Sequence, residues 1–475
     1  MNYQIDLLDY CIIIIYLLSI FGLAFFSSRK YQSDNIVEDQ YLAGKSLTIT
    51  ESLCSIIATE VSALTFLGIP AFAFGSDYSF IQIYFGAIFG RLIIAKIMLP
   101  AVYNKGITVY SVMSYFGDKN GQRLITLFYS LNKLLAVGVR LFSGSILIAE
   151  FFNISIYVAV GIICFVTFFY TLIGGLKAVV RTDMAQMLLF IFGGLVAHYM
   201  IPEISNHSWS ELMTISFDAG KTEFFNLSNP WPFIIGVFGG ILFDMATHGV
   251  DQDFVQRLTG NKTMRGAQIA IMTSSFFSIF VGLLFLSIGS LLWAHYQIVT
   301  PPDISNDRIF AYFITNYFPV GIKGLMVAGV LAATMSTLDS TINALSACLY
   351  NDIFNHKEKD LKNVQKFYYR DTLIITVLLM LVAFIASKSD GLLLFGLKIT
   401  SWTAGSLLAV FFATVIFKIA RLNVVNVFAA YLFGIIGVYL NTYHFKLNWN
   451  FNVYFGFILA IMIMYIIEKL TKEKN

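Results

Sequence analysis

Hydroxyl and carboxyl side chains are concentrated in one otherwise apolar stretch, LAATMSTLDSTINALSA, at residues 331–347. On a helix, five of its residues fall at i, i+3, i+4, i+7 and i+10 and form one stripe: Ala333, Ser336, Thr337, Ser340 and Asn343. Oxygen ligands suit alkali and alkaline-earth cations, and the stripe carries no imidazole or thiolate for a transition metal. The stripe therefore predicts a cation site, although Ser and Thr in membrane helices also serve helix packing.

A second element has to complete such a site, because the carbonyl groups of a continuous helix are bonded along its axis. Transporters supply the missing ligands from broken helices, whose unwound carbonyls face the ion. Residues 49–72 are one candidate, with polar residues around Glu60 and with Pro70 near the end. Residues 231–249 are the other candidate, and three glycines mark the expected break: Gly236, Gly239 and Gly240.

The composition requires that these elements lie in a membrane. Hydrophobic residues make up 57% of the 475 residues, charged residues only 12%, and the mean hydropathy is +0.74, which excludes an ordinary soluble globular protein. Apolar runs of about 20 residues, each able to cross a bilayer core of about 30 Å, recur along the whole chain. The sequence predicts thirteen spans: 9–27, 49–72, 78–102, 124–150, 155–174, 182–202, 231–249, 267–295, 319–350, 372–388, 391–417, 423–440 and 451–468.

Basic residues are distributed unevenly between the two sides that these spans define. If the N-terminus lies outside, 21 of the 31 Lys and Arg residues fall in the inner loops and tail, and five in the outer loops and span ends. The positive-inside rule therefore places the N-terminus outside and the C-terminus in the cytoplasm of a cell-membrane protein. The net charge of +3 reflects this topology and indicates no nucleic-acid partner.

The first apolar run is expected to be a retained anchor, because it has no basic stretch before it and no small-residue cleavage site. Four cysteines lie within apolar spans at spacings that fit neither a zinc site nor a disulfide framework: Cys11, Cys54, Cys164 and Cys348. We expect them to be core residues.

Four separated motifs resemble, in order and spacing, the signatures of the sodium/solute symporter family: SIIATEVSALTFLGIP, GGLKAVVRTDMAQ, GVDQDFVQRLTGNK and AGVLAATMSTLDSTINALSA. The resemblance runs through essentially the whole chain and is closest to the branch that transports sialic acid and organic anions. It implies the leucine-transporter-type fold, an all-α polytopic membrane protein of about 13 transmembrane helices. It also implies a five-plus-five inverted repeat with two broken helices, and sodium as the coupling ion.

The resemblance implies a single membrane transporter domain over residues 1–475. Within it, residues 9–27 would form an extra N-terminal helix and residues 423–468 two extra C-terminal helices. The first repeat would occupy residues 49–202 and the second residues 231–417.

The resemblance also implies two sodium sites. The main site would use three main-chain carbonyls and two hydroxyls: those of Ala58, Val61, Ala333, Ser336 and Thr337. A second site would combine a carboxylate with the striped helix: Asp183, Ser336, Asp339 and Ser340. Asp339 stands where these relatives have a serine, so it could strengthen the second site or replace it. Asp183 has another interpretation, because Asp is a favoured N-cap and the span 182–202 begins beside it.

The candidate solute residues follow from the same branch. Arg140 in GVRLFSGSI resembles the arginine that meets the substrate carboxylate, a task that suits a planar, permanently charged guanidinium. An ion pair between Arg140 and Glu60 is the alternative, and it would make both residues structural. The remaining candidates are Glu60, Ser62, Thr65 and Gln82, with Phe80 and Tyr84 beside Gln82.

These observations predict a sodium-coupled symporter that imports a small polar organic solute by alternating access. A carboxylate such as sialic acid is the first candidate, and a neutral sugar, a polyol or an amino acid is the alternative. A transporter-like solute sensor or a passive facilitator would be a different class. No signalling domain follows KLTKEKN to favour the sensor, and one closed ion site argues against a pore.

The expected partners are sodium, the solute and the lipid bilayer, with no obligatory protein partner. Protons or lithium remain open as alternative driving ions. The sequence contains no nucleotide-binding loop, nucleophile elbow or metal-hydrolase cluster, so we expect no enzymatic activity.

Overall fold

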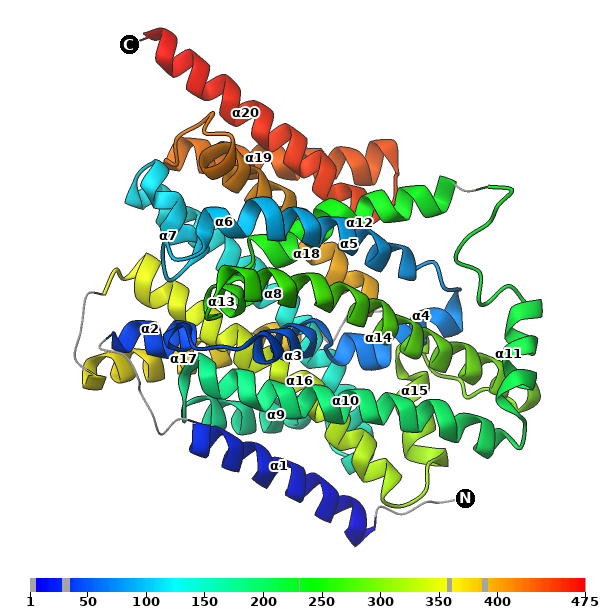
Figure 1. Ribbon diagram of the computed structural model, residues 1–475. Helices are drawn as coiled ribbons and strands as arrows, with labels where there is room; N and C mark the ends of the chain where they lie inside the picture. Colours follow the sequence, from blue (N-terminus) through cyan, green and yellow to red (C-terminus); the bar gives the residue numbers. More distant parts are fainter. Residues whose placement is uncertain (1–5, 28–34, 230, 357–360, 387–391, 475) are drawn as a thin grey trace.

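The computed structural model describes residues 6–27, 35–229, 231–356, 361–386 and 392–474, and its long helices run roughly parallel (Figure 1). The described residues form no β-strand beyond two isolated bridges. The longer helices are α1 (Leu7–Ser27), α3 (Ile49–Glu60), α5 (Ile81–Ile93), α8 (Lys119–Phe152), α9 (Ile156–Thr171), α10 (Gly175–Ser205), α12 (Trp231–Gly249), α14 (Met264–Ile298), α15 (Asn306–Tyr317), α16 (Ile322–Cys348), α17 (Leu361–Ala386), α18 (Leu392–Phe411), α19 (Val424–Tyr439) and α20 (Asn452–Lys474).

Shorter helices connect or extend these elements. They are α2 (Ile36–Leu42), α4 (Ile69–Gly75), α6 (Leu99–Val102), α7 (Val109–Met113), α11 (Trp209–Asp218) and α13 (Gln252–Thr259). Five π-helical turns continue longer helices: Leu64–Gly68, Ile94–Met98, Leu349–Ile353, Phe412–Ile416 and Leu440–Phe445. Three 3-10 turns complete the described elements: Ala43–Lys45, Ser114–Phe116 and Trp449–Phe451.

The predicted all-α membrane architecture is confirmed. Among the described residues, 11 helices are long and apolar enough to cross a membrane, and the bent pair Ile49–Glu60 and Leu64–Gly75 makes a twelfth candidate. The span predicted at 155–174 corresponds to α9, which has only 16 residues, fewer than the roughly 20 of a typical span. The count of thirteen therefore stays a prediction.

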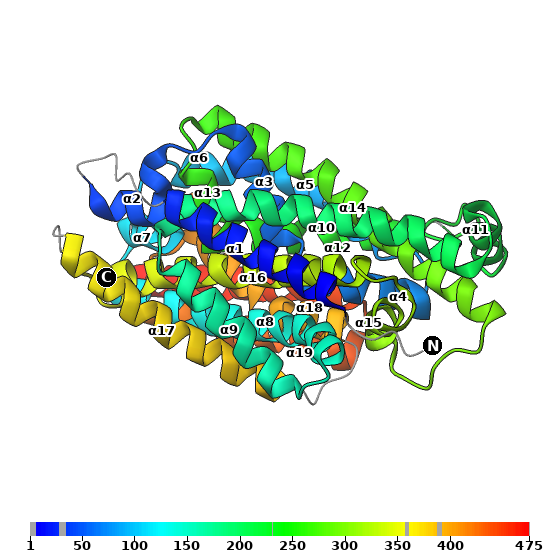
Figure 2. The ribbon, with the colours of Figure 1, turned by 90° about the horizontal axis from the view of Figure 1, so that it is seen from below.

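Helix α16 lies at the centre of the molecule. Every residue from Met326 to Cys348 is buried, so the polar stripe faces protein on all sides and not lipid. Helices α8, α10 and α1 pack directly against it, and α1 crosses it in Figure 2. Asp9 of α1 fixes this crossing, because its Oδ1 accepts hydrogen bonds from the backbone N–H groups of Gly321, at 2.7 Å, and Gly324, at 2.8 Å. These bonds cap the first turn of α16 from a neighbouring helix.

Both predicted broken helices are interrupted, but the second is broken at a different place. The first bends by 57° between α3 and α4. Helix α12 instead runs unbroken through its glycines and ends before Val250 and Asp251, which separate it from α13. The glycines serve close packing: a Cβ atom on Gly240 would lie 3.2 Å from the Cα atom of Gly86 in α5. They therefore bring α5 and α12 together and do not unwind α12.

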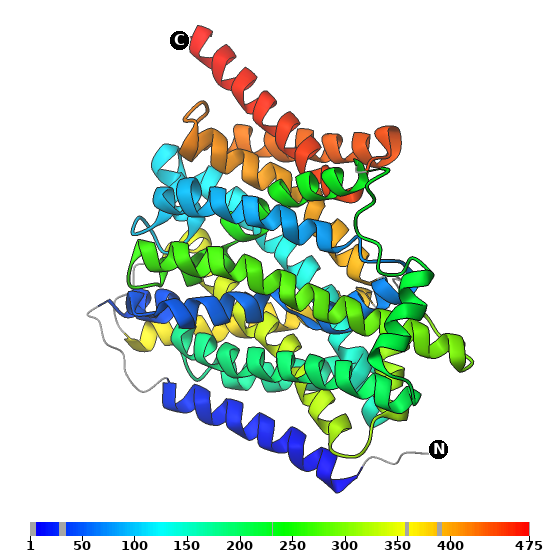
Figure 3. The same cartoon turned by 45° about the vertical axis from the view of Figure 1, so that its right-hand side comes forward.

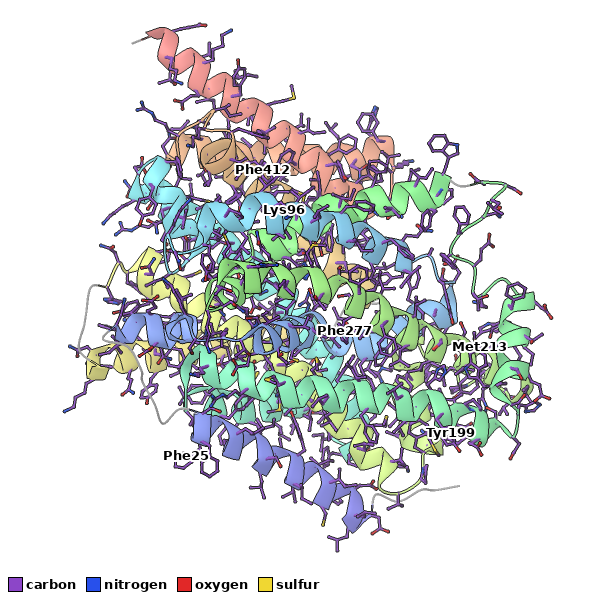
Figure 4. The ribbon with its side chains drawn as sticks, in the orientation of Figure 1. Phe25, Lys96, Tyr199, Met213, Phe277 and Phe412 are labelled. Atoms are coloured by element: carbon purple, nitrogen blue, oxygen red, sulfur yellow. The ribbon has the colours of Figure 1, made fainter. Side chains whose placement is uncertain are left out.

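The additional helices lie at the edges of the bundle. Figure 3 shows α1 at one edge and α19 and α20 at the opposite edge. Outward-facing side chains are apolar or aromatic, for example Phe25, Tyr199 and Phe277, which are 47%, 67% and 40% exposed (Figure 4). Such a surface fits a lipid environment.

Candidate functional site

The break between α3 and α4 releases two carbonyl groups from the helical ladder. The N–H of Ser62 bonds the Thr65 hydroxyl at 3.3 Å, and the N–H of Thr65 bonds the Ser62 carbonyl at 2.8 Å. In a continuous helix, these two N–H groups would bond the carbonyls of Ala58 and Val61. Both carbonyls predicted to bind sodium are therefore among the carbonyls that the break releases.

The polar stripe of α16 faces this break. The Ser336 hydroxyl donates to the Ala58 carbonyl at 3.0 Å and lies 3.2 Å from the Ala333 carbonyl. The Thr337 hydroxyl donates to the Ala333 carbonyl at 3.1 Å. Four of the five predicted ligands are thus in contact, and Val61 lies at the break itself. Their polar atoms are all uncharged oxygens, a donor set that fits a monovalent hard cation.

The second predicted set gathers around a carboxylate inside α10. Helix α10 begins at Gly175, so Asp183 lies in its third turn, and the N-cap interpretation is wrong. Asp183 Oδ2 accepts a hydrogen bond from the Ser55 hydroxyl at 2.5 Å. The same oxygen forms an ion pair with the Arg257 guanidinium at 3.2 Å. Its Oδ1 is buried and has no hydrogen-bond partner among the described residues.

Arg257 joins the members of this second set. Its guanidinium donates to Asp183 and to the Ser340 hydroxyl. Asp339 accepts hydrogen bonds from Tyr170, at 2.5 Å, and from Ser340, at 3.3 Å. Ser336 belongs instead to the first group, one helical turn away. A sodium ion at this second set would therefore share Asp183 and Ser340 with an internal cation, which the sequence did not predict.

A cavity of about 130 Å³ lies between the α3–α4 break, α5, α8, the α12–α13 break and α18. Its walls are largely apolar: Leu64, Ile69, Phe80, Ile83, Ala87, Ala136, Val137, Phe243, Phe254, Leu393 and Leu397. Its polar lining residues are Glu60, Ser62, Thr65, Tyr84, Tyr129, Asn132, Lys133, Arg140, Asp244, Thr247, His248, Asp251 and Thr400. A cavity that combines apolar walls with convergent polar groups is the usual form of a small-molecule site.

Arg140 lines this cavity with an unpaired guanidinium. The described residues offer it no hydrogen bond and no ion pair. Glu60, its expected competitor, instead pairs with Arg91 of α5 at 2.8 Å and accepts a hydrogen bond from Ser278 at 2.7 Å. The alternative of an Arg140–Glu60 ion pair is therefore wrong, because Arg91 is the partner of Glu60.

Arg91 is the centre of a buried group that we name the scaffold cluster: Glu60, Arg91, Asp244 and His248. Arg91 is fully buried, lies 3.3 Å from Asp244, and contacts the His248 Nε2 atom at 3.2 Å. Because a guanidinium only donates, Nε2 accepts this bond, and the protonated Nδ1 faces Asp244 at 3.1 Å. The cluster joins α3, α5 and α12, and Ser274 and Ser278 add α14 through bonds to Arg91.

The other predicted solute residues divide into two groups. Ser62, Thr65, Phe80 and Tyr84 line the cavity. Gln82 does not, because its amide donates to the Phe224 carbonyl at 2.9 Å. Phe80, Ile83, Tyr84 and Ala87 share one face at helical spacing, and Gln82 points from another face. The prediction that Gln82 contacts the solute is therefore not supported, because Gln82 does not line the cavity.

At the end of the cavity near α13, a second ionic group joins α8 to α13. Lys133 lies 2.8 Å from Asp251 and 3.0 Å from Asp253. The Tyr129 hydroxyl donates to Asp251 at 2.6 Å. In the sequence, Lys133 lies inside the predicted span 124–150, and no role was predicted for it. Its helical spacing of seven residues from Arg140 was the available signal that both share a face.

Known proteins fit this architecture. The model of the sodium:solute symporter family matches residues 40–434. The sodium/sialic acid symporter NanT of Aliivibrio fischeri is 26% identical over 394 residues, which cover 80% of this chain and 76% of the relative. Sodium-coupled monocarboxylate transporter 1 of Mus musculus is 28% identical over 402 residues, which cover 79% of this chain and 63% of the relative.

The fold is similar to that in a solved structure of a Na⁺-coupled sialic acid symporter, which was determined in a substrate-bound, outward-open state. The two structures agree with a TM-score of 0.86 over 98% of each chain, at 22% sequence identity. The family model covers most of the sequence, and the broken helices and the central α16 agree with its fold. The chain belongs to the sodium:solute symporter family.

Proposed function

We propose that the protein carries a small carboxylate solute, such as a sialic acid, together with sodium by alternating access. The unpaired Arg140 guanidinium in the central cavity is the observation that supports a carboxylate, because a half-buried cation without a partner is costly. The relatives point the same way, since the solutes in their names, sialic acid and monocarboxylates, are both carboxylates.

Sodium and solute share the same broken helix in this proposal. Ala58 and Val61 would bind sodium, and Ser62 and Thr65, immediately after them, line the cavity. A sodium ion held between these carbonyls and Ser336 stabilises the conformation of the break. That conformation in turn sets the positions of Ser62 and Thr65 in the cavity wall. The coupling between the two ligands is then a shared conformation and needs no direct contact. At the second set, Asp183, Ser336, Asp339 and Ser340, we propose a second sodium that shares its ligands with Arg257.

A second cavity of about 470 Å³ marks the side from which the solute arrives. It is lined by residues of α4 and by Ser305, Asn306 and Asp307. Leu393 lines both cavities, so one apolar side chain lies between them. In Figure 1 this side also holds the N-terminus, and the C-terminus lies at the opposite end. With the basic loops, this arrangement supports an outside N-terminus and a cytoplasmic C-terminus.

A short monocarboxylate is the second candidate solute. The cavity walls are mainly aliphatic and aromatic, which suits a compact apolar body behind one carboxylate. Arg140 would have the same role for either solute. We also propose that the chain is a carrier and not an enzyme, and that it works with sodium, solute and lipid alone. Transport by the purified protein in liposomes tests this last point.

Thermal stabilisation of the purified protein tests the proposal. The panel contains N-acetylneuraminic acid, lactate, pyruvate, glucose, inositol and alanine, each with sodium and with potassium. We expect a shift that requires sodium and a carboxylate together, because ligands that bind only the folded state stabilise it. The matched variants are Arg140→Lys, which keeps the charge, and Arg140→Gln, which removes it. A shift caused by glucose or inositol, unchanged in Arg140→Gln, contradicts the carboxylate assignment.

A further inference from the structure

We propose that Lys133, Asp251 and Asp253 form the gate between the solute cavity and the side of the membrane on which the C-terminus lies. We call these three residues the Lys133 latch. The inference rests on the transport function but not on the identity of the solute. It assigns a role to a buried ion-pair group that neither sodium nor solute binding uses.

The latch closes the cavity at the break between α12 and α13. Lys133 and Tyr129 reach this break from α8 and hold Asp251, the residue at the break. From α7, the Tyr110 hydroxyl donates to the Val250 carbonyl at 2.9 Å. In Figure 1, α7 and α13 lie toward the end of the bundle that holds the C-terminus. A solute leaving the cavity toward that end has to pass these bonds.

The same short helix also contacts the predicted ion sites. Asp253 accepts from Lys133 on one side and from Arg257 on the other, at 2.6 Å. Arg257 donates at 2.7 Å to the Ser55 hydroxyl, one turn before Ala58, and also to Ser340, one turn after Ser336. The polar chain therefore runs from the latch to both helices of the main sodium site. Sodium binding that orders α3 and α16 also orders Ser55 and Ser340, which bind Arg257. Because Arg257 and Lys133 both bind Asp253, this order extends to Lys133.

An ionic latch is suited to repeated opening. Lys133 is 6% exposed and Asp253 is fully buried, so the closed pairs exclude water. When water enters, each charge is hydrated. The free energy gained by this hydration is close to the attraction that is lost between the two charges of the buried pair. A small bias from the ion site can therefore decide between the closed and the open state. At the other end, Leu393 lines both the solute cavity and the second cavity.

Accessibility of an engineered cysteine tests the latch without any solute. The four native cysteines are replaced by alanine, and Ala136, which lines the cavity one turn from Lys133, becomes cysteine. A membrane-impermeant maleimide is applied to the side that holds the C-terminus, in sodium and in potassium. Lys133→Met should raise the labelling rate by about fivefold or more in sodium, because the open state gains population. The conservative variant Lys133→Arg keeps a cation beside both Asp251 and Asp253 and should label at a rate close to that of the parent.

Two controls keep the result specific. Lys96→Met removes an exposed lysine of the neighbouring α5–α6 segment (Figure 4) and should leave the rate unchanged. Tyr129→Phe removes one hydrogen bond to Asp251 and should raise the rate by about twofold, which keeps the test usable if Lys133→Met does not fold. Parent-like labelling of both Lys133→Met and Tyr129→Phe overturns the proposal. A Lys133→Arg variant that labels as fast as Lys133→Met overturns it as well.

Discussion

Two ionic groups line the cavity, and they differ in the helices that they join. The scaffold cluster and the Lys133 latch contain ion pairs of similar length, 2.8 Å for Arg91–Glu60 and 2.8 Å for Lys133–Asp251. The scaffold cluster lies between α3, α5, α12 and α14, in which α5 packs against α12 and α14 packs against both α3 and α5. The latch instead crosses from α8 to the short α13, which follows a break.

This difference teaches that burial and distance alone do not assign a role to a buried ion pair. The helices joined by the scaffold cluster are also held by close glycine contacts, so the cluster fixes a rigid unit. The latch connects elements whose separation would open a path. We therefore expect substitutions in the scaffold cluster to change stability most, and substitutions in the latch to change the conformational equilibrium most.

Arg91→Met should have the largest effect on stability. It leaves Glu60 and Asp244 as buried carboxylates without their cation, and removing one partner of a buried ion pair costs about 3–5 kcal/mol. The measurement is the denaturation midpoint of the purified protein, together with its monodisperse yield. A variant as stable as the parent would contradict the structural role of the scaffold cluster.

Lys133→Met should destabilise the protein less. Asp253 keeps its bond to Arg257 and Asp251 keeps its bond to Tyr129, so the loss approaches that of charged hydrogen bonds, about 1.5–3 kcal/mol. The same denaturation measurement compares it with Arg91→Met. If Lys133→Met were the less stable of the two, the distinction between the two groups would fail.

Ser336→Ala should weaken sodium binding with little effect on folding. The hydroxyl is the only side-chain atom that this residue contributes to the main site, so we expect about a tenfold loss of sodium affinity, or about 1.4 kcal/mol. Sodium-dependent stabilisation gives the affinity. Ser275→Ala is the matched control, because its hydroxyl bonds only a carbonyl of its own helix, that of Met272. Equal effects of both variants would remove Ser336 from the site.

Arg140→Gln should have the smallest effect on stability. Its guanidinium has no partner among the described residues, so its loss should change the free energy of unfolding by less than about 0.5 kcal/mol. The affinity for the carboxylate should nevertheless fall by tenfold or more, about 1.4 kcal/mol. Denaturation and solute-dependent stabilisation of one preparation separate these effects. A large loss of stability would indicate a structural Arg140 and contradict the assignment.

Local patterns predicted the polar stripe and the first helix break well. The stripe of Ser336, Thr337 and Ser340 follows from helical spacing, and the polar residues near Glu60 mark the first break. Both features depend on neighbours within a few residues. The glycines of α12 misled the prediction of the second break, because glycine permits close helix contact as readily as unwinding.

Pairings between distant helices could not be predicted in the same way. The sequence suggested only Arg140 as an ion-pair partner of Glu60, and the rotation of α5 and α8 determines that the guanidinium of Arg91 reaches Glu60 instead. The prediction that Gln82 lines the cavity was wrong for the same reason. Gln82 and Ile83 are neighbours in sequence, but their side chains point from different faces of α5. Arg257 belongs to a recognised motif, but its approach to Asp183 depends on the short α13, which the predicted spans did not include.

Uptake into proteoliposomes tests the central claim most directly. The purified protein is reconstituted, and radiolabelled N-acetylneuraminic acid, lactate or pyruvate is supplied with an inward sodium gradient or with potassium in its place. The account predicts that at least one carboxylate accumulates above its external concentration with the sodium gradient only, and that Arg140→Gln abolishes this accumulation. Equal uptake in potassium would contradict sodium-coupled symport, and unchanged uptake by Arg140→Gln would contradict the role of Arg140.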